Sequence, residues 1–173
     1  MKIFHRQSMV FCLLGALFAA PGIVAYVFYL HPNWLGEGTT NKGRLLNPPV
    51  LLAHPNPRGM WQLALWSPKG CTKDCIAQLD KLARIRLALG RHLYEVDALL
   101  LMDTSLPKSL VGALDGQDIH RLSLSPLERK QMTVLTNEAA FFIINPNNYL
   151  ILAYATTAKS EDIFYDLKQL LTR

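Results

Sequence analysis

The stretch WQLALWSPKGCTKDCIAQL, residues 61–79, decides the fold of this chain. Its first part alternates in the way that is typical of a β-strand, over Met60–Trp66. Pro and Gly then break the pattern, and apolar residues recur at helical spacing up to a glycine stop. We expect a strand, a tight turn and a helix over about Thr72–Leu89 with Thr72 as its cap, which places Cys71 and Cys75 at the joint between strand and helix.

The rest of the chain repeats this alternation of strands and helices. Asp103–Gln117 is loop-like, with a short helix expected near Leu110–Leu114. Ser125 precedes Pro126, and Glu128 completes a capping box that starts a further helix. Strands are expected at Val96–Met102, Ile119–Leu124, Ala139–Ile144 and Tyr149–Ala155, and a last helix at Ser160–Leu171. A β–α–β half followed by a β–β–α half predicts an α/β, thioredoxin-like central sheet flanked by helices.

The N-terminal region is apolar from Met9 to Leu30 and holds no charged residue. About 20 apolar residues cross the hydrocarbon core of a bilayer as a helix. Lys2 and Arg6 precede the run, which predicts a cytoplasmic tail over residues 1–8 and a transmembrane anchor over 9–30. The alternative is a signal peptide, for which Phe18–Ala20 is a weak cleavage pattern.

Residues 31–58 are rich in Pro, Gly and Asn, and predict an extended stalk or arm. Several leucines in the arm indicate that part of it packs on the domain. The thioredoxin-like domain is then expected over residues 59–173. With the N-terminus inside, this domain lies on the periplasmic side of an inner membrane that the chain crosses once.

Composition and charge exclude several classes of protein. Half of the 173 residues are apolar and 18% are charged, which excludes a disordered tail and a polytopic membrane protein. The 18 Lys and Arg against 13 Asp and Glu give a net charge of +5. Aromatic residues do not interleave with a basic stripe, so nucleic acid is not an expected partner.

Cys71 and Cys75 are the only cysteines outside the apolar run, which holds Cys12. Cysteines four apart at a helix start have Cα atoms about 6 Å apart, within the span of a disulfide. The N–H groups and positive partial charge of a helix N-terminus favour a thiolate. The pair can therefore be an inert disulfide, a redox-active dithiol, or two thiolate ligands for Cu(I).

The strand, the short loop, the Cys-x-x-x-Cys pair and the long helix resemble the Sco (SenC) family of cytochrome oxidase assembly proteins. Residues 137–148, NEAAFFIINPNN, are similar to a Sco segment that begins with a histidine and ends in Asp-Pro-Asp-Gly. The resemblance implies a thioredoxin-like domain on one membrane helix. It also implies a copper site formed by two cysteines and that histidine, and a cytochrome oxidase subunit or another copper-site protein as partner.

The chain departs from the Sco pattern at one ligand. Asn137 stands where the histidine is expected, and an amide does not replace an imidazole as a copper ligand. His54, in the arm, is the substitute to test first. Thioredoxins carry a proline just before the matching strand, and this chain has none there.

The first functional hypothesis is therefore a periplasmic assembly factor for the copper centre of a respiratory cytochrome oxidase. In it Cys71 is the attacking thiol and Cys75 the resolving one, and at most the chain is a thiol–disulfide oxidoreductase. Copper is the cofactor that the resemblance implies, with Cys71 and Cys75 as ligands, and His54 is the candidate that the arm offers as a third ligand. The alternatives are a general periplasmic thiol–disulfide protein and a binding subunit with a structural disulfide.

Overall fold

The structure, a computed structural model, describes residues 2–31, 40–71, 73–102, 114 and 116–172. It separates into two compact units, Met1–Thr40 and Asn41–Arg173. Thr72, the expected helix cap, lies outside the described residues, and so does the segment 103–113 that contains most of the expected short helix.

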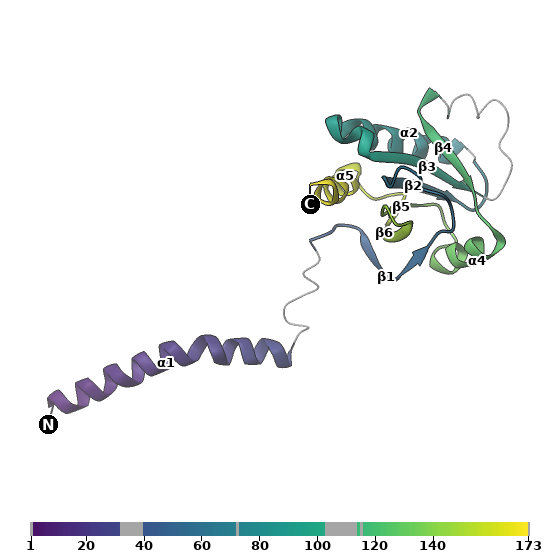
Figure 1. Cartoon of the computed structure of the whole chain (residues 1–173). Helices are drawn as coiled ribbons and strands as arrows, with labels where there is room; N and C mark the ends of the chain where they lie inside the picture. The colour runs from purple at the N-terminus through teal and green to yellow at the C-terminus, as the bar shows by residue number, and fades with distance from the viewer. Residues whose placement is uncertain (1, 32–39, 72, 103–113, 115, 173) are drawn as a thin grey trace. The chain divides into compact units, whose positions relative to one another are not determined.

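The first unit is dominated by helix α1, Lys2–Leu30, which continues through Pro21 (Figure 1). Its window Leu13–Leu30 has a mean hydropathy of 2.0, and no part of that window is buried. Among the described residues this is the one helix that is long and apolar enough to cross a membrane. The helix contains the run 9–30 that the sequence predicts as an anchor, and it also includes residues 2–8, which the sequence predicts to form a tail.

The second unit is built on one mixed sheet in the strand order β1-β6-β5-β2-β3-β4. Strands β2, β3 and β4 run parallel, while β5, β6 and β1 join antiparallel neighbours on the other side of β2. The strands are β1 (Arg44–Leu51), β2 (Trp61–Ser67), β3 (Val96–Met102), β4 (Ile119–Ser123), β5 (Ala140–Ile144) and β6 (Tyr149–Ala155). The strand β2, which carries the joint with the cysteines, is therefore central.

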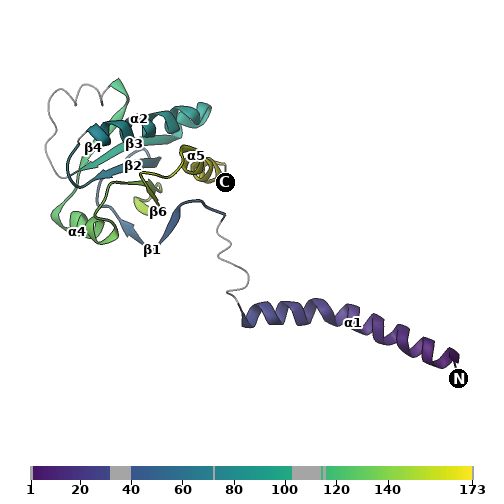
Figure 2. The same ribbon diagram turned by 180° about the vertical axis from the view of Figure 1, so that it is seen from behind.

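Helices cover both faces of the sheet (Figures 1 and 2). Helices α2 (Lys73–Ala88) and α5 (Ser160–Leu171) pack on one face, and α4 (Pro126–Leu135) packs on the other. A short 3₁₀ helix, η2 (Gly90–Glu95), links α2 to β3. This confirms the predicted α/β, thioredoxin-like architecture.

Alternation along β2 divides the core into two clusters. Leu63 and Leu65 face α2 and α5, whereas Ala64 and Trp66 face α4. All four are at most 1% exposed. Successive side chains of a strand point to opposite faces. The central strand β2 therefore contributes side chains to both core clusters and is fixed by packing on both faces.

Most expected elements are confirmed to within a residue or two. β3, β6 and α5 have the predicted bounds. The capping box at the start of α4 is present in full, because the Ser125 hydroxyl accepts from the Glu128 N–H while the Glu128 carboxylate accepts from the Ser125 N–H.

The arm expected over residues 31–58 differs from the structure in its described part. Arg44–Leu51 forms β1, which pairs antiparallel with β6, and the compact unit already begins at Asn41. Pro48 and Pro49 lie in a register shift between Leu45 and Val50, where the strand leaves the ladder. Because proline donates no backbone hydrogen bond, it is tolerated in a strand at the edge of a sheet. The two prolines also interrupt the alternating pattern by which a strand is predicted from sequence.

A buried carboxylate secures the start of β1. Asp166 of α5 is 2% exposed and accepts from the N–H groups of Lys42 and Gly43 at 2.7 and 2.8 Å. It also accepts from the Tyr154 hydroxyl of β6 at 2.6 Å. Burial first, and the neighbouring Asp166 second, raise the pKa of Tyr154, so this hydroxyl stays a donor.

Candidate functional site

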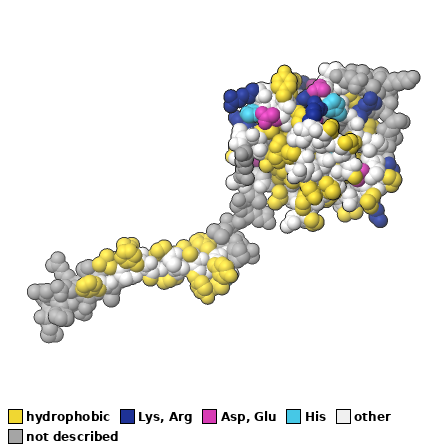
Figure 3. All heavy atoms as spheres, viewed as in Figure 1, with side chains coloured by type: hydrophobic (Ala, Val, Ile, Leu, Met, Phe, Trp, Pro, Cys, Tyr) yellow, Lys and Arg dark blue, Asp and Glu magenta, His cyan; other side chains and the backbone are white. Residues whose placement is uncertain are grey.

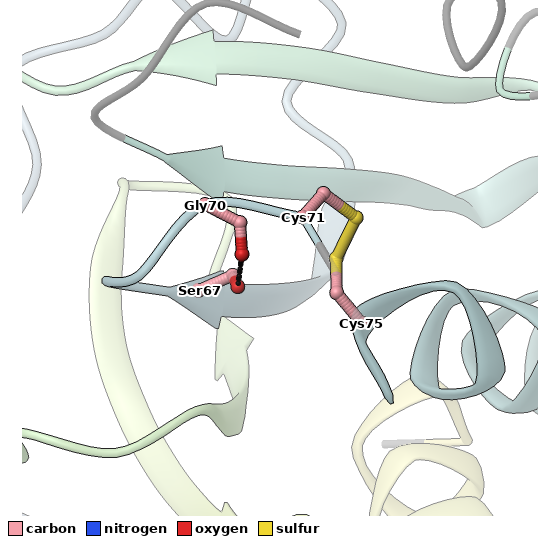
Figure 4. Close-up of a disulfide and its surroundings, with 4 residues drawn as sticks. All are labelled: Ser67, Gly70, Cys71 and Cys75. Carbon is pink, nitrogen blue, oxygen red and sulfur yellow. Dashed lines mark hydrogen bonds between the residues drawn. A yellow bond between two sulfur atoms is a disulfide. The ribbon is translucent and has the colours of Figure 1, made fainter. Parts of the chain in front are cut away.

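The turn between β2 and α2 brings Cys71 to the end of the sheet (Figure 4). Ser67 ends β2, and its hydroxyl donates to the Gly70 carbonyl oxygen at 2.7 Å. Gly70 has a φ of +79°, in the left-handed region that glycine adopts without steric cost. The Ser-Pro-Lys-Gly segment therefore makes a closed turn that leads directly from strand to helix.

Cys71 and Cys75 form a disulfide, and their Cα atoms lie 5.0 Å apart (Figure 4). Cys75 belongs to the first turn of α2, is 5% exposed and is part of the core beneath that helix. Cys71 is only partly buried and packs against the edge of the same core. The structure thus brings the two predicted cysteines together and makes Cys71 the sulfur that a reagent meets first.

The charges around the disulfide favour a thiolate when it opens. Cys75 lies where the helix N-terminus directs unpaired N–H groups and a partial positive charge. Lys69 and Lys73 are exposed on either side of Cys71 and add positive charge, which Asp74 partly offsets. A sulfur leaving from this position is stabilised as an anion.

A cavity of about 450 Å³ opens beside Cys75. We call it the dithiol cavity. Its wall includes the turn after β2, the Cys75 side of α2 and the segment before β5, with Asn137, Glu138 and Ala139. Asn137, which the resemblance to Sco proteins aligns with their histidine, lines the same cavity as Cys75.

Gln78 and Thr156 also line the dithiol cavity, and the sequence reading missed both. The Oε1 atom of Gln78 is buried and has no hydrogen-bond partner among the described residues. Gln78 follows Cys75 by three residues on the same helix, so i,i+3 spacing could have identified it. Thr156 could not have been found in this way, because only the antiparallel return of β6 brings it to the site.

His54 lies far from the cysteines. Its Nε2 atom is 3.0 Å from Oε1 of Gln62, near the first residue of β2, whereas Cys71 follows the last residue of that strand. The five residues from Gln62 to Ser67 span about 16 Å at the usual strand rise. The structure therefore does not place His54 with the dithiol as a third ligand.

The residues present do not complete a copper site of the Cys–Cys–His type. Across the described residues, no three side chains of His, Cys, Asp or Glu form a group that could hold a metal ion. After reduction the site offers the two thiolates of Cys71 and Cys75, with the amide of Asn137 in the cavity wall. Two thiolates suit Cu(I) as a transient cargo.

Comparison with solved structures gives the same fold at low sequence identity. The crystal structure of Arabidopsis thaliana ScoI with copper bound matches at 12% identity and a TM-score of 0.52, over 66% of this chain and 85% of that one. Yeast Sco1 with copper bound matches at 15% identity and a TM-score of 0.52, over 66% and 79%. The resemblance to Sco proteins is thus confirmed at the level of fold.

The curated proteins include no match to this chain. A family model described as "transmembrane-like, thioredoxin-like, C-terminal domain" matches residues 61–173, which begin at β2 and include both cysteines. Because this match covers more than half of the sequence, the chain belongs to the transmembrane-like, thioredoxin-like C-terminal domain family.

Proposed function

We propose that this chain is a membrane-anchored, periplasmic thiol–disulfide protein that assists the assembly of the copper centre of a cytochrome oxidase. One observation carries the proposal: a disulfide at the strand-to-helix joint, with Cys71 partly exposed and Cys75 buried at the wall of the dithiol cavity. A disulfide that only stabilises the fold needs neither this difference in exposure between its two cysteines nor a cavity beside it. The fold shared with Sco proteins supports the choice of client.

The chemistry is a two-electron exchange. A dithiol reductant first reduces the Cys71–Cys75 disulfide that the structure holds. The Cys71 thiolate then attacks a disulfide of the client, and one client sulfur leaves as a thiolate and takes up a proton. The Cys75 thiolate then attacks the Cys71 sulfur of the mixed disulfide and releases the second client thiol. The client gains two electrons, the Cys71–Cys75 disulfide forms, and the client cysteines are free to receive copper.

Single-cysteine variants test these roles. We expect Cys75→Ser to attack a client disulfide and stop as a stable mixed disulfide, because the resolving thiol is missing. Cys71→Ser should form far less of this adduct, because Cys75 is buried. Trapping followed by mass spectrometry measures both. Equal trapping by the two variants would contradict the assignment of Cys71 as attacking thiol.

The reduction potential separates exchange from a structural disulfide. Equilibration of the full chain with dithiothreitol redox buffers should give a potential above about −300 mV, the range of exchangeable disulfides. A potential below that value, with no trapped adduct, would show that the disulfide only stabilises the fold.

Copper transfer is the second candidate function. It is favoured because Cys71 and Cys75, once reduced, place two thiols side by side where they can bind Cu(I) transiently. Cu(I) titration of the reduced chain should show binding that Cys71→Ser abolishes and His54→Ala leaves unchanged, because His54 lies at the far end of β2. Asn137→His should tighten Cu(I) binding by adding an imidazole to the cavity wall. Binding that depends on His54 would overturn this placement.

The membrane arrangement is part of the proposal. It is supported by helix α1 and by the cations at Lys2 and Arg6, which favour an N-terminus inside. Protease added to intact spheroplasts should degrade the domain that contains Cys71 and leave α1 in the membrane. Protection of the domain until the membrane is opened would refute the orientation.

A further inference from the structure

Two more hollows adjoin the dithiol cavity in turn, one at the same end of the sheet and one along β1. A middle hollow of about 380 Å³ shares Glu138, Ala139 and Thr156 with the dithiol cavity. A third hollow, of about 520 Å³, lies between β1 and α4 and shares Arg44 and Leu135 with the middle one. Each hollow thus shares wall residues with the next, and we call the three together the strand-end groove.

The strand register explains this arrangement. Trp66, one residue before the end of β2, pairs with the first residue of β5, and that residue pairs with the last residue of β6. Arg44, which opens β1, pairs with β6 two residues before its end. The groove therefore crosses the ends of β2, β5, β6 and β1 in turn. Three strand spacings are about 14 Å, the length of about four residues of extended chain.

The far end of the groove is apolar and open. Leu45 and Val134 line the third hollow and are 56% and 81% exposed, and Leu127 beside them is 68% exposed. Figure 3 shows hydrophobic side chains gathered on the part of the domain where Figure 1 draws β1 and α4. The charged residues in this wall are Arg44 and Lys130, both cationic.

We propose that the strand-end groove binds an extended polypeptide segment of the client, with its cysteine at Cys71 and an aliphatic side chain in the β1–α4 hollow. An acidic residue next to that side chain would meet Arg44 and Lys130. This proposal rests on the thiol–disulfide exchange function of the dithiol. It adds a statement of which client sequences the protein recognises. Continuity with the dithiol cavity selects a polypeptide over a lipid surface, because only a chain links a cysteine to an aliphatic group across about 14 Å.

Peptide substrates test this recognition in the full chain, held in lipid nanodiscs of phosphatidylcholine and carrying Cys12→Ser so that only the dithiol reacts. Each peptide carries one cysteine as a mixed disulfide with thionitrobenzoate, and a Leu-Asp pair at an increasing distance from it. The chain is first reduced with dithiothreitol and then freed of it, because the structure holds the disulfide. Attack by the Cys71 thiolate on the peptide sulfur releases coloured thionitrobenzoate, and attack by Cys75 on the Cys71 sulfur then releases the peptide thiol and re-forms the disulfide. KM is therefore the peptide concentration that gives half of the maximal single-turnover rate. KM should be lowest when the leucine stands about four residues from the cysteine.

A double variant removes the far subsite. Leu45→Thr with Val134→Ser should raise KM for the best peptide roughly tenfold, because burial of one aliphatic side chain is lost. The reaction with dithiobis(nitrobenzoate), which reaches only the dithiol, should not change. The matched control, Leu87→Ser with Tyr94→Ser, alters two exposed side chains outside the groove and should leave KM unchanged.

The outcomes separate the two proposals. No reaction with either the peptides or dithiobis(nitrobenzoate) would refute the exchange function itself. Reaction with the small disulfide, together with a KM independent of leucine position, would refute the groove alone. Slowed hydrogen exchange at β1 and α4 only on phosphatidylglycerol vesicles, or only at high protein concentration, would assign this face to a membrane or a second copy and also refute it.

Discussion

At the scale of single residues, Asp166 connects three segments through one carboxylate. It holds the N–H groups before β1 and the hydroxyl of Tyr154 while it is almost fully buried. Removal of a buried carboxylate that accepts several hydrogen bonds strongly destabilises a protein, because each donor is then left without a partner.

We therefore expect Asp166→Ala to lower the free energy of unfolding by about 3 kcal/mol. Tyr154→Phe, which removes one donor and leaves the backbone N–H bonds in place, should cost about 1 kcal/mol. Urea unfolding followed by circular dichroism measures both. Equal losses in the two variants would show that the backbone N–H bonds to Asp166 contribute little.

Glu128 gives a prediction about pH. Burial alone would raise the pKa of Glu128, but hydrogen bonds from Ser125 and the Ala53 N–H, with the charge of His54, outweigh it and hold the pKa below its ordinary 4.5. A carboxylate with a lowered folded pKa stabilises the protein above 4.5, and this contribution is lost as pH falls through the folded value.

Glu128→Gln should accordingly flatten the acid-side loss of stability, which unfolding at a series of pH values measures. Glu138→Gln changes an exposed carboxylate and is the matched control, expected to keep the wild-type profile. If the Glu128→Gln profile is as steep as that of the wild type, Glu128 does not contribute to the acid sensitivity.

At the scale of elements, β1 depends on close packing at its start. A Cβ atom placed on Gly43 would overlap the ring of Tyr154, which is buried. Gly43→Ala should destabilise the domain by about 1–3 kcal/mol, the usual cost of overpacking. Thermal unfolding checks this, with Gly116→Ala as control, because a Cβ there meets open space. An unchanged melting temperature in Gly43→Ala would mean that β1 can shift away from the ring.

The elements also show what the sequence could and could not predict. Local periodicity and capping depend only on residues close together in the sequence. They predict the strand that ends at Ser67, the helix cap at Ser125 and the helix that begins at Ser160. The sequence predicts an arm where β1 lies, because Pro48 and Pro49 interrupt the strand pattern and the pairing with β6 joins residues far apart in the chain. The partners of Cys75 in its cavity, such as Thr156, depend on register between strands far apart in the chain.

At the scale of the whole molecule, we expect the fold to persist without the disulfide. The two core clusters lie on both faces of the sheet, and the disulfide closes a loop of only a few residues. A loop of this size stabilises a protein by about 2 kcal/mol in the chain-entropy model.

We expect Cys71→Ser with Cys75→Ser to lower the free energy of unfolding by about 2 kcal/mol and to keep the far-ultraviolet circular dichroism spectrum. The wild type in dithiothreitol should show the same loss. Collapse of the spectrum in either sample would mean that the domain folds only when oxidised, which is incompatible with a reversible exchange cycle.

The bonds of Asp166 have a mechanical consequence. A pull on the chain before Lys42 enters the domain at the backbone groups that Asp166 holds, and next loads the β1–β6 pair. Strands β6 and β5 stand between that pair and β2. Tension applied at Lys42 is therefore borne by β1 and β6, on the far side of the sheet, and the joint at Cys71 keeps its geometry.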